Sequence, residues 1–323
     1  MLSNKEIYRQ ICERESIPLM AQYRWMEAVS YAKDWDVIIV WIDEHEAHCV
    51  ENVAAALPFH LLKKYGIRFI LMPQLTQFSS IYVNPSIEPA AIISLVVEKL
   101  DSYLQKNHVF YCQLQGYYDE KFIDSARRHG YLLSERYSYR IENRPEYNSI
   151  ITAYNNDRKR NLKRAKGLSL CNIDIEKFYE FHKKCLADRG LIISYRYELL
   201  QHIYNALTPS SEIEFYGAKN MSGQLLAAAV MISDNNVSYY LLSAYSQPFK
   251  HKGAMTWLIT QLILIVNGRG QIFDFEGSMV PSIADAYRSY GSTPATYFRI
   301  EKYRFLGIKL LMYFWKKVNR IKL

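Results

Sequence analysis

Four side chains between residues 274 and 288 have types and a spacing that could bind an amine and remove a proton from it. Asp274 and Glu276 end an apolar run, two residues apart, and Gly277 follows at once. Alternate residues of a strand share one face, so both carboxylates are expected on the same side of a strand end. Tyr287 and Arg288 stand in a helix-like segment that leads back toward the same place. We predict that Asp274, Glu276, Tyr287 and Arg288 form the catalytic group.

Two carboxylates at the end of a buried strand are well placed to bind an ammonium group or to remove a proton from it. When two carboxylates lie close together, one of them has a raised pKa, which suits a general base. Arg288 offers charge-assisted hydrogen bonds to an oxyanion, a carboxylate or a phosphate.

A purely structural interpretation of the same residues stays open. The two carboxylates could accept backbone N–H groups in the turn that follows them, or could pair with Arg288. Arg288 itself could form a structural salt bridge with Asp274, Glu276 or Asp285.

A second candidate group opens a helix predicted over residues 252–267. Lys250 and Lys252 are cations, and Gly253 and Ala254 offer backbone amides at the helix start. Free N–H groups at a helix N-terminus, with cations beside them, favour anion binding. We predict a binding site for the phosphates of a cofactor or co-substrate here. A solvated basic loop is the alternative.

A third group consists of hydrogen-bonding side chains that follow an early strand. Gln74, Thr76 and Gln77 are predicted to bind substrate, with satisfaction of their own loop as the alternative. His45 and His48 have a spacing found in metal sites, but they fall in a predicted hairpin turn without a third ligand. No metal is therefore predicted.

The net charge of +8 is concentrated in two segments. Residues 156–167 contain six basic residues and one Asp, and residues 298–323 contain eight basic residues and one Glu. Within the second segment, residues 306–322 are predicted to form an amphipathic helix with a basic face. Localised positive charge suggests phosphate groups, RNA or an anionic membrane surface as partner. The helix over 306–322 is expected either to lie on the inner membrane face or to dock on the protein.

The chain has 323 residues, which favours two domains. Both halves repeat one order of elements: helices, an antiparallel three-strand meander, helix, strand, helix, strand. Such an order predicts a mixed, mainly antiparallel sheet with helices on both faces, an α/β fold in each half. Phe273 and Phe275 are expected to point into a helix layer. The polar stretch 142–149 places the boundary so that the domains are residues 1–145 and 146–323.

The predicted strands and helices are as follows. In the first half we expect helices over 4–14, 22–33, 85–104 and 119–129 and strands over 36–42, 48–59, 68–73, 108–114 and 132–141. In the second half we expect helices near 146–166 and over 174–187, 195–206, 252–267 and 282–290, with strands over 212–219, 223–233, 236–246, 271–275 and 293–300.

Composition favours a globular cytoplasmic protein. Half of the residues are hydrophobic and about a fifth are charged. The polar N-terminal stretch has no signal-peptide pattern, and no apolar run is long enough to predict a transmembrane segment. The five cysteines form no CxxC pairs, which is typical of a reduced protein.

The order of elements, in duplicate, resembles the GNAT acyltransferase fold, and the residues resemble its FemAB-like branch. These bacterial transferases carry two GNAT domains and add amino acids from aminoacyl-tRNA to peptidoglycan precursors. The resemblance covers essentially the whole chain. It rests on four stretches in order: MPQLTQFSS (72–80), DRKRNLKRAKG (157–167), FDFEGS (273–278) and AYRSYG (286–291).

Two departures from the family pattern bear on mechanism. Related acetyltransferases hold the CoA pyrophosphate with an Arg/Gln-x-x-Gly-x-Gly/Ala loop, whereas this chain has KHKGAM (250–255), with Met255 in place of the small residue. FemAB-like enzymes place an aromatic–Lys pair where Tyr287 and Arg288 stand. Arginine keeps the charge but does not donate a proton at neutral pH.

The resemblance implies an N-acyltransferase of the bacterial cytoplasm that acts on an amine of a phosphate-bearing cell-wall or surface-glycan precursor. The donor would be aminoacyl-tRNA or acyl-CoA, and no tightly bound cofactor is expected. Two alternatives remain: an acetyl-CoA-dependent sugar-amine N-acetyltransferase of polysaccharide biosynthesis, and a non-catalytic GNAT scaffold that only binds a precursor or nucleic acid.

Overall fold

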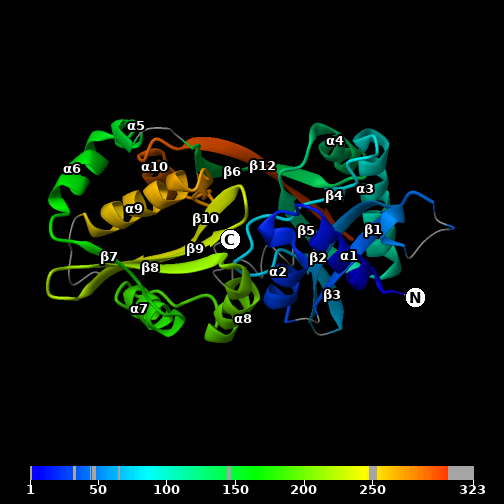
Figure 1. Cartoon of the computed structure of the whole chain (residues 1–323). Helices are drawn as coiled ribbons and strands as arrows, with labels where there is room; N and C mark the ends of the chain where they lie inside the picture. The colour runs from blue at the N-terminus through cyan, green and yellow to red at the C-terminus, as the bar shows by residue number, and fades with distance from the viewer. Residues whose placement is uncertain are drawn as a thin grey trace. The chain divides into compact units, whose positions relative to one another are not determined.

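The computed structural model describes residues 2–31, 34–43, 45, 49–64, 66–143, 147–246 and 253–304. The chain forms two compact units (Figure 1). Unit 1 combines the described residues up to Glu135 with those from Tyr297 onward, and unit 2 is Arg136–Thr296. In the described part of the chain, no helix combines the length and the hydropathy needed to cross a bilayer.

Unit 1 begins with helices whose starts are fixed by local hydrogen bonds. The Ser3 side chain accepts from the backbone N–H of Glu6, and the Glu6 carboxylate accepts from the backbone N–H of Ser3, which forms a capping box. Asp119 caps a later helix in the same way through the N–H of Phe122. The elements of unit 1 are α1 (Asn4–Arg14), η1 (Leu19–Ala21), α2 (Tyr23–Val29), β1 (Trp35–Trp41), η3 (Val50–Asn52), β2 (Val53–Lys64), β3 (Ile67–Leu71), β4 (Tyr82–Val83), α3 (Pro89–Lys106), β5 (Val109–Gly116) and α4 (Glu120–Arg128).

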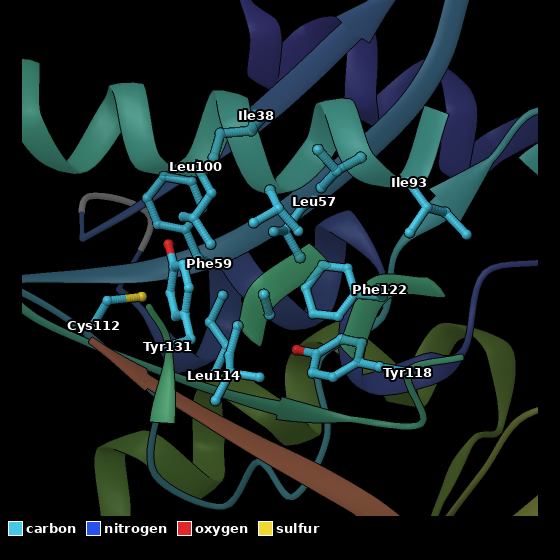
Figure 2. Close-up of a cluster of buried hydrophobic side chains, with 14 of the residues drawn as sticks. Ile38, Leu57, Phe59, Ile93, Leu100, Cys112, Leu114, Tyr118, Phe122 and Tyr131 are labelled. Carbon is cyan, nitrogen blue, oxygen red and sulfur yellow. The ribbon is translucent and has the colours of Figure 1, made fainter. Parts of the chain in front are cut away.

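The sheet of unit 1 has the order β1-β2-β3-β5-β12. β1, β2 and β3 form an antiparallel meander, β5 lies parallel to β3, and β12 (Thr293–Tyr303) pairs antiparallel with β5. One face of this sheet packs under α3 and α4. Figure 2 shows Leu57, Phe59 and Leu114 of the sheet facing Leu100 of α3 and Phe122 of α4, all of them buried.

Unit 2 repeats this arrangement. Its elements are α5 (Tyr147–Thr152), α6 (Asn156–Arg164), β7 (Ser169–Asn172), α7 (Ile175–Ala187), α8 (Tyr197–Leu207), η4 (Thr208–Ser210), β8 (Ile213–Lys219), β9 (Leu225–Ser233), β10 (Val237–Tyr245), α9 (Ala254–Gly268), β11 (Ile272–Asp274) and α10 (Pro281–Arg288). The strand order is β6-β11-β10-β9-β8-β7, where β6 is Leu132–Ile141.

The sheet of unit 2 has the same pairing directions as that of unit 1. β8, β9 and β10 are antiparallel, and β11 lies parallel to β10. α9 covers one face of the sheet and α7 lies on the other (Figure 1). The predicted fold class, a mixed sheet flanked by helices in each half, is therefore confirmed.

The predicted order of elements is also confirmed, but two pairings were not foreseen. β6, which ends the first half, pairs with β11 in unit 2, and β12, which follows unit 2 in the chain, pairs with β5 in unit 1. The structural division therefore falls at residues 135 and 296, and not at the expected boundary near residue 145. Sequence periodicity also missed the short strands β4 and β7, and it started β2 several residues too early, where η3 lies.

Candidate active site

Asp274 is the last residue of β11 and is completely buried. Its Oδ2 accepts a hydrogen bond from Nε of Arg140 at 2.7 Å. Its Oδ1 accepts from the hydroxyl of Ser138 and from the backbone N–H of Glu276, the latter at 2.7 Å. Both carboxylate oxygens of Asp274 thus accept hydrogen bonds from the protein. Asp274 therefore holds the end of β11 in place.

Glu276 and Gly277 form a turn in the left-handed backbone region. Their φ angles are 59° and 72°. A side chain on Gly277 would place its Cβ 2.0 Å from the carbonyl oxygen of Tyr137, so only glycine fits against β6. A non-glycine residue at positive φ is strained, and such strain gathers at functional sites. Because the strand ends at Asp274, the expectation that Asp274 and Glu276 share one strand face was wrong.

The turn leaves the Glu276 carboxyl in an unusual electrostatic setting. The side-chain atom Oε1 is buried and has no hydrogen-bond partner among the described residues. Burial, together with the charge of Asp274, raises the pKa of Glu276 well above its ordinary value. The prediction that one of the two carboxylates has a raised pKa is therefore confirmed. Buried polar groups are almost always paired, so an unpaired carboxyl oxygen is a candidate for chemistry.

Aromatic rings surround this carboxyl. Phe275 is buried and stacks on Tyr287, with ring centroids 4.5 Å apart and 21° between the planes. Burial, and then the charge of Glu276, raise the pKa of the Tyr287 phenol. Phe273 and Phe275 belong to the buried core that α9 covers, as predicted. Tyr287 thus lies beside Glu276, in a setting of low polarity.

In the described part of the chain, the guanidinium of Arg288 bonds to Tyr139 and Asp285 and not to the carboxylates of Asp274 and Glu276. Its guanidinium donates to the hydroxyl of Tyr139 at 2.8 Å and forms an ion pair with Asp285 at 2.5 Å. About half of the Arg288 side chain is exposed. Among the partners considered from the sequence, Asp285 is the one observed, and an exposed pair of this kind leaves the guanidinium accessible to a substrate.

Arg140 and Ser138 are the residues that sequence reasoning missed. Both lie on β6, and Arg140 stands directly opposite Asp274 in the register of β6 and β11. An opposite charge across two strands is a recognisable signal. This signal depends on the pairing of β6 with β11, which the sequence alone does not indicate.

The start of α9 is closely covered by the basic helix α6. A Cβ on Gly253 would lie 2.3 Å from the carbonyl oxygen of Asn161, so glycine is required where the two helices meet. Arg158 of α6 donates to Ser289 Oγ at 2.7 Å and lies over the ring of Tyr290 at 4.6 Å. α6 is therefore fixed to both α9 and α10. Of the four residues of the predicted phosphate site, Gly253 and Ala254 are at this junction, and Ala254 is buried; Lys250 and Lys252 lie outside the described residues.

The uncharged candidates of unit 1 form hydrogen bonds to other residues of that unit. Thr76 is buried and accepts from Trp25 Nε1 at 3.0 Å. The Gln77 side chain donates to the hydroxyl of Tyr297 at 2.5 Å. Gln74 is exposed, and its carbonyl oxygen accepts from the Thr76 hydroxyl at 3.3 Å. Thr76 and Gln77 are thus hydrogen-bonded to α2 and β12 of unit 1, and their role in substrate binding stays a prediction.

Two further candidates from the sequence, the histidine pair and the amphipathic segment, lie partly or wholly outside the described residues. His45 is described and His48 is not, and the described residues contain no cluster of three ligating side chains that could hold a metal ion. The amphipathic segment 306–322 lies outside the described residues.

β10 and β11 separate beside the candidate carboxyl. They pair only over Val237–Tyr239 and Ile272–Asp274. β10 continues to Tyr245 against β9, with an irregular register between Tyr240 and Leu242. The edge of β10 that faces away from β9 is therefore left without a strand partner, among the described residues, from Tyr240 onward.

Comparison with known proteins agrees with this geometry. Residues 155–277, which include β10, β11 and Glu276, match the family described as an acetyltransferase (GNAT) domain. No curated protein sequence matches the chain significantly.

Three solved structures share the fold over nearly the whole chain. A structure of FemX is 10% identical, covers 92% of this chain and 96% of its own, and has a TM-score of 0.68. L-PGS from Bacillus licheniformis is 12% identical, with coverages of 95% and 94% and a TM-score of 0.55. A tandem GNAT protein from the clavulanic acid biosynthesis pathway is 10% identical, with both coverages at 93% and a TM-score of 0.54.

These findings define the class of protein. It has the tandem GNAT fold, and residues 155–277 of its second unit match the acetyltransferase (GNAT) domain. The match over residues 155–277 supports an acyltransferase, and FemX and L-PGS share the fold of the chain.

Proposed function

We propose that the protein transfers an acyl or aminoacyl group to an amine, with Glu276 as the group that removes the proton from the amine. The observation that carries this proposal is the buried Oε1 of Glu276, which has no hydrogen-bond partner among the described residues and belongs to a carboxyl of raised pKa. A general base works best when its pKa lies near the working pH, and a raised carboxyl pKa moves in that direction.

The other residues of the strand end have supporting roles in this mechanism. Asp274, held by Arg140 and Ser138, fixes the backbone N–H of Glu276 and so positions its carboxyl. Arg288, half exposed, supplies a donor for the oxyanion or for a phosphate of the substrate. Asp274 thus acts through Glu276 and does not itself exchange protons with substrate.

The donor lies along the open edge of β10. Its backbone groups from Tyr240 onward can pair with an extended molecule that carries amides, as a peptide strand pairs with a sheet edge. The pantetheine arm of an acyl-CoA has such amides, and the acetyltransferase match supports this donor. An aminoacyl-tRNA donor is supported by the likeness to FemX.

The acceptor amine belongs to a phosphate-bearing precursor of the cell wall or of a surface glycan, in the bacterial cytoplasm. Support comes from α6 and its flank, where Lys163, Arg164 and Lys166 are exposed cations. Clustered exposed cations attract phosphate groups through a field that salt screens.

Transfer assays with a pair of matched variants test the proposal. Thiol release from acetyl-CoA and transfer of labelled amino acid from tRNA are each measured with a panel of amino-sugar nucleotide acceptors. Glu276→Gln should lower the turnover rate by about 10² to 10⁴-fold. Glu198→Gln, the same change on the exposed side of α8, should leave the rate unchanged.

Full activity of the Glu276→Gln variant would refute the assigned role of Glu276. Absence of transfer by the wild type with both donors would favour a scaffold that only binds precursor. Activity with acetyl-CoA and an amino sugar alone would select the sugar-amine N-acetyltransferase.

A further inference from the structure

An exposed apolar stripe leads from solvent to the candidate active site of unit 2. Met279, Val280 and Ile283 are exposed to 46%, 48% and 40%, although all three are large apolar side chains. They stand at the start of α10, directly after the Glu276–Gly277 turn. Large exposed apolar side chains that lie side by side mark binding sites more often than isolated ones do.

The stripe continues into the site along one face of α10. Ile283 and Tyr287 stand four residues apart in α10 and so lie on the same side of the helix, and Val280 is the N-cap residue that precedes it. Exposure falls along this face, since the Tyr287 ring is partly buried and stacks on Phe275. The inner end of the stripe is therefore next to Glu276.

The helix packs on its unit through Ala284 and Tyr287, and Val280 and Ile283 stay exposed. Among the residues of α10, Ala284 is the buried one, while Tyr290, just past the helix, is buried in the core. The charged residues Asp285 and Arg288 pair with each other and leave the stripe free of charge. An uncharged surface that leads toward the buried carboxyl oxygen of Glu276 suits an aliphatic chain whose polar end reacts at that carboxyl.

We propose that Met279, Val280 and Ile283 form a subsite for the aliphatic chain of the acyl group that the protein transfers, with the carbonyl end at Tyr287 and the tail toward Met279. This inference rests on the proposed acyl transfer and adds the substrate class: a straight-chain fatty acyl group. Val280 to Tyr287 spans about 10 Å of helix, which is the reach of a chain of about eight carbons.

Binding measurements over a chain-length series test the subsite. The probes are straight-chain acyl-CoA esters of two to ten carbons and the matching free carboxylates, each titrated by calorimetry below its micelle concentration. Because the stripe covers one side of the chain, each added methylene should tighten binding about twofold up to about eight carbons, half of what full burial provides.

Two isoleucine variants form a matched pair. Ile283→Gln should reduce the affinity ratio between the eight-carbon and two-carbon probes at least tenfold. Ile192→Gln should leave it unchanged, because Ile192 is 92% exposed in the segment between α7 and α8. Both substitutions lie on the surface, so both variants are expected to fold.

The outcomes separate this inference from the proposed function. If neither probe series shows chain-length dependence in the wild type, the subsite is refuted even where acyl transfer is observed. If chain-length dependence persists in Ile283→Gln, the subsite is refuted as well. If the dependence is present and is lost in Ile283→Gln, the subsite stands, and absence of acyl transfer in the same preparation would count only against the proposed function.

Discussion

Replacement of Asp274 by asparagine is expected to destabilise unit 2 by about 3 kcal/mol. The substitution removes the charge that Arg140 faces at 2.7 Å while keeping the size of the side chain. Breaking one partner of a buried ion pair costs about 3–5 kcal/mol. The lower end applies here because the Arg140 side chain is 21% exposed, so water reaches part of the orphaned guanidinium.

The loss is measurable by scanning calorimetry at pH 7. For a domain of this size, about 1 kcal/mol corresponds to roughly 2–4 °C, so the melting temperature of unit 2 should fall by roughly 6–12 °C. Asp285→Asn is the matched control, because it removes an exposed carboxylate from its pair with Arg288 and should cost less than about 1 kcal/mol.

A double-mutant cycle sharpens the experiment. Arg140→Gln combined with Asp274→Asn should recover part of the stability that Asp274→Asn alone loses, since the orphaned charge is then absent. If the melting temperatures of Asp274→Asn and Asp285→Asn differ by less than about 2 °C, the inference that Asp274 holds the end of β11 in place is refuted.

Three further predictions concern buried groups. The raised pKa of Glu276 means that, above pH 4.5, its carboxyl keeps a proton in the folded protein and loses it in the unfolded chain. The free energy of unfolding should therefore fall as the pH rises, by up to about 1.4 kcal/mol per pH unit, until the folded pKa is reached. By urea unfolding, the wild type should be less stable at pH 8 than at pH 5, and this difference should be smaller in Glu276→Gln. Equal differences in the two proteins would contradict the prediction. Burial lowers the pKa of His182 from 6.5 to about 4, so acidification over that interval should remove about 3 kcal/mol of stability, and His182→Gln should abolish this part of the acid sensitivity. Gly277→Ala should destabilise by more than about 2 kcal/mol through its contact with Tyr137, whereas Gly223→Ala, at a similar φ of 79° but with open space around it, should cost only about 1 kcal/mol; equal losses would show that the close approach is unimportant.

The order of strands and helices was predictable because periodicity is a local property. The apolar runs between turn residues over 212–246 and the apolar spacing in 252–267 each depend on a few neighbouring residues, and both predictions agree with β8, β9, β10 and α9. Pairing partners are not local. Nothing within 108–116 indicates that β12, and not β6, pairs with β5. The two-domain boundary was misplaced for the same reason.

The candidate site was predictable in its residues more than in its geometry. Asp274, Glu276 and Tyr287 were singled out because charges at the end of an apolar strand need partners. Their separate functions depend on the register that brings Arg140 opposite Asp274 and on the left-handed turn at Glu276. Gly277 was the available signal for that turn, since a glycine that ends a strand often stands where no side chain fits.

The pairing of β12 with β5 has a consequence for synthesis on the ribosome. Unit 2 is one continuous segment, so it can fold as soon as residues up to 296 have emerged. Unit 1 needs β12, which is translated only after all of unit 2. Until then the edge of β5 lacks its partner, and an unpaired edge strand is prone to aggregation. The first unit to be translated is therefore the last to be completed, and nascent chains stalled before residue 297 should depend most on chaperones.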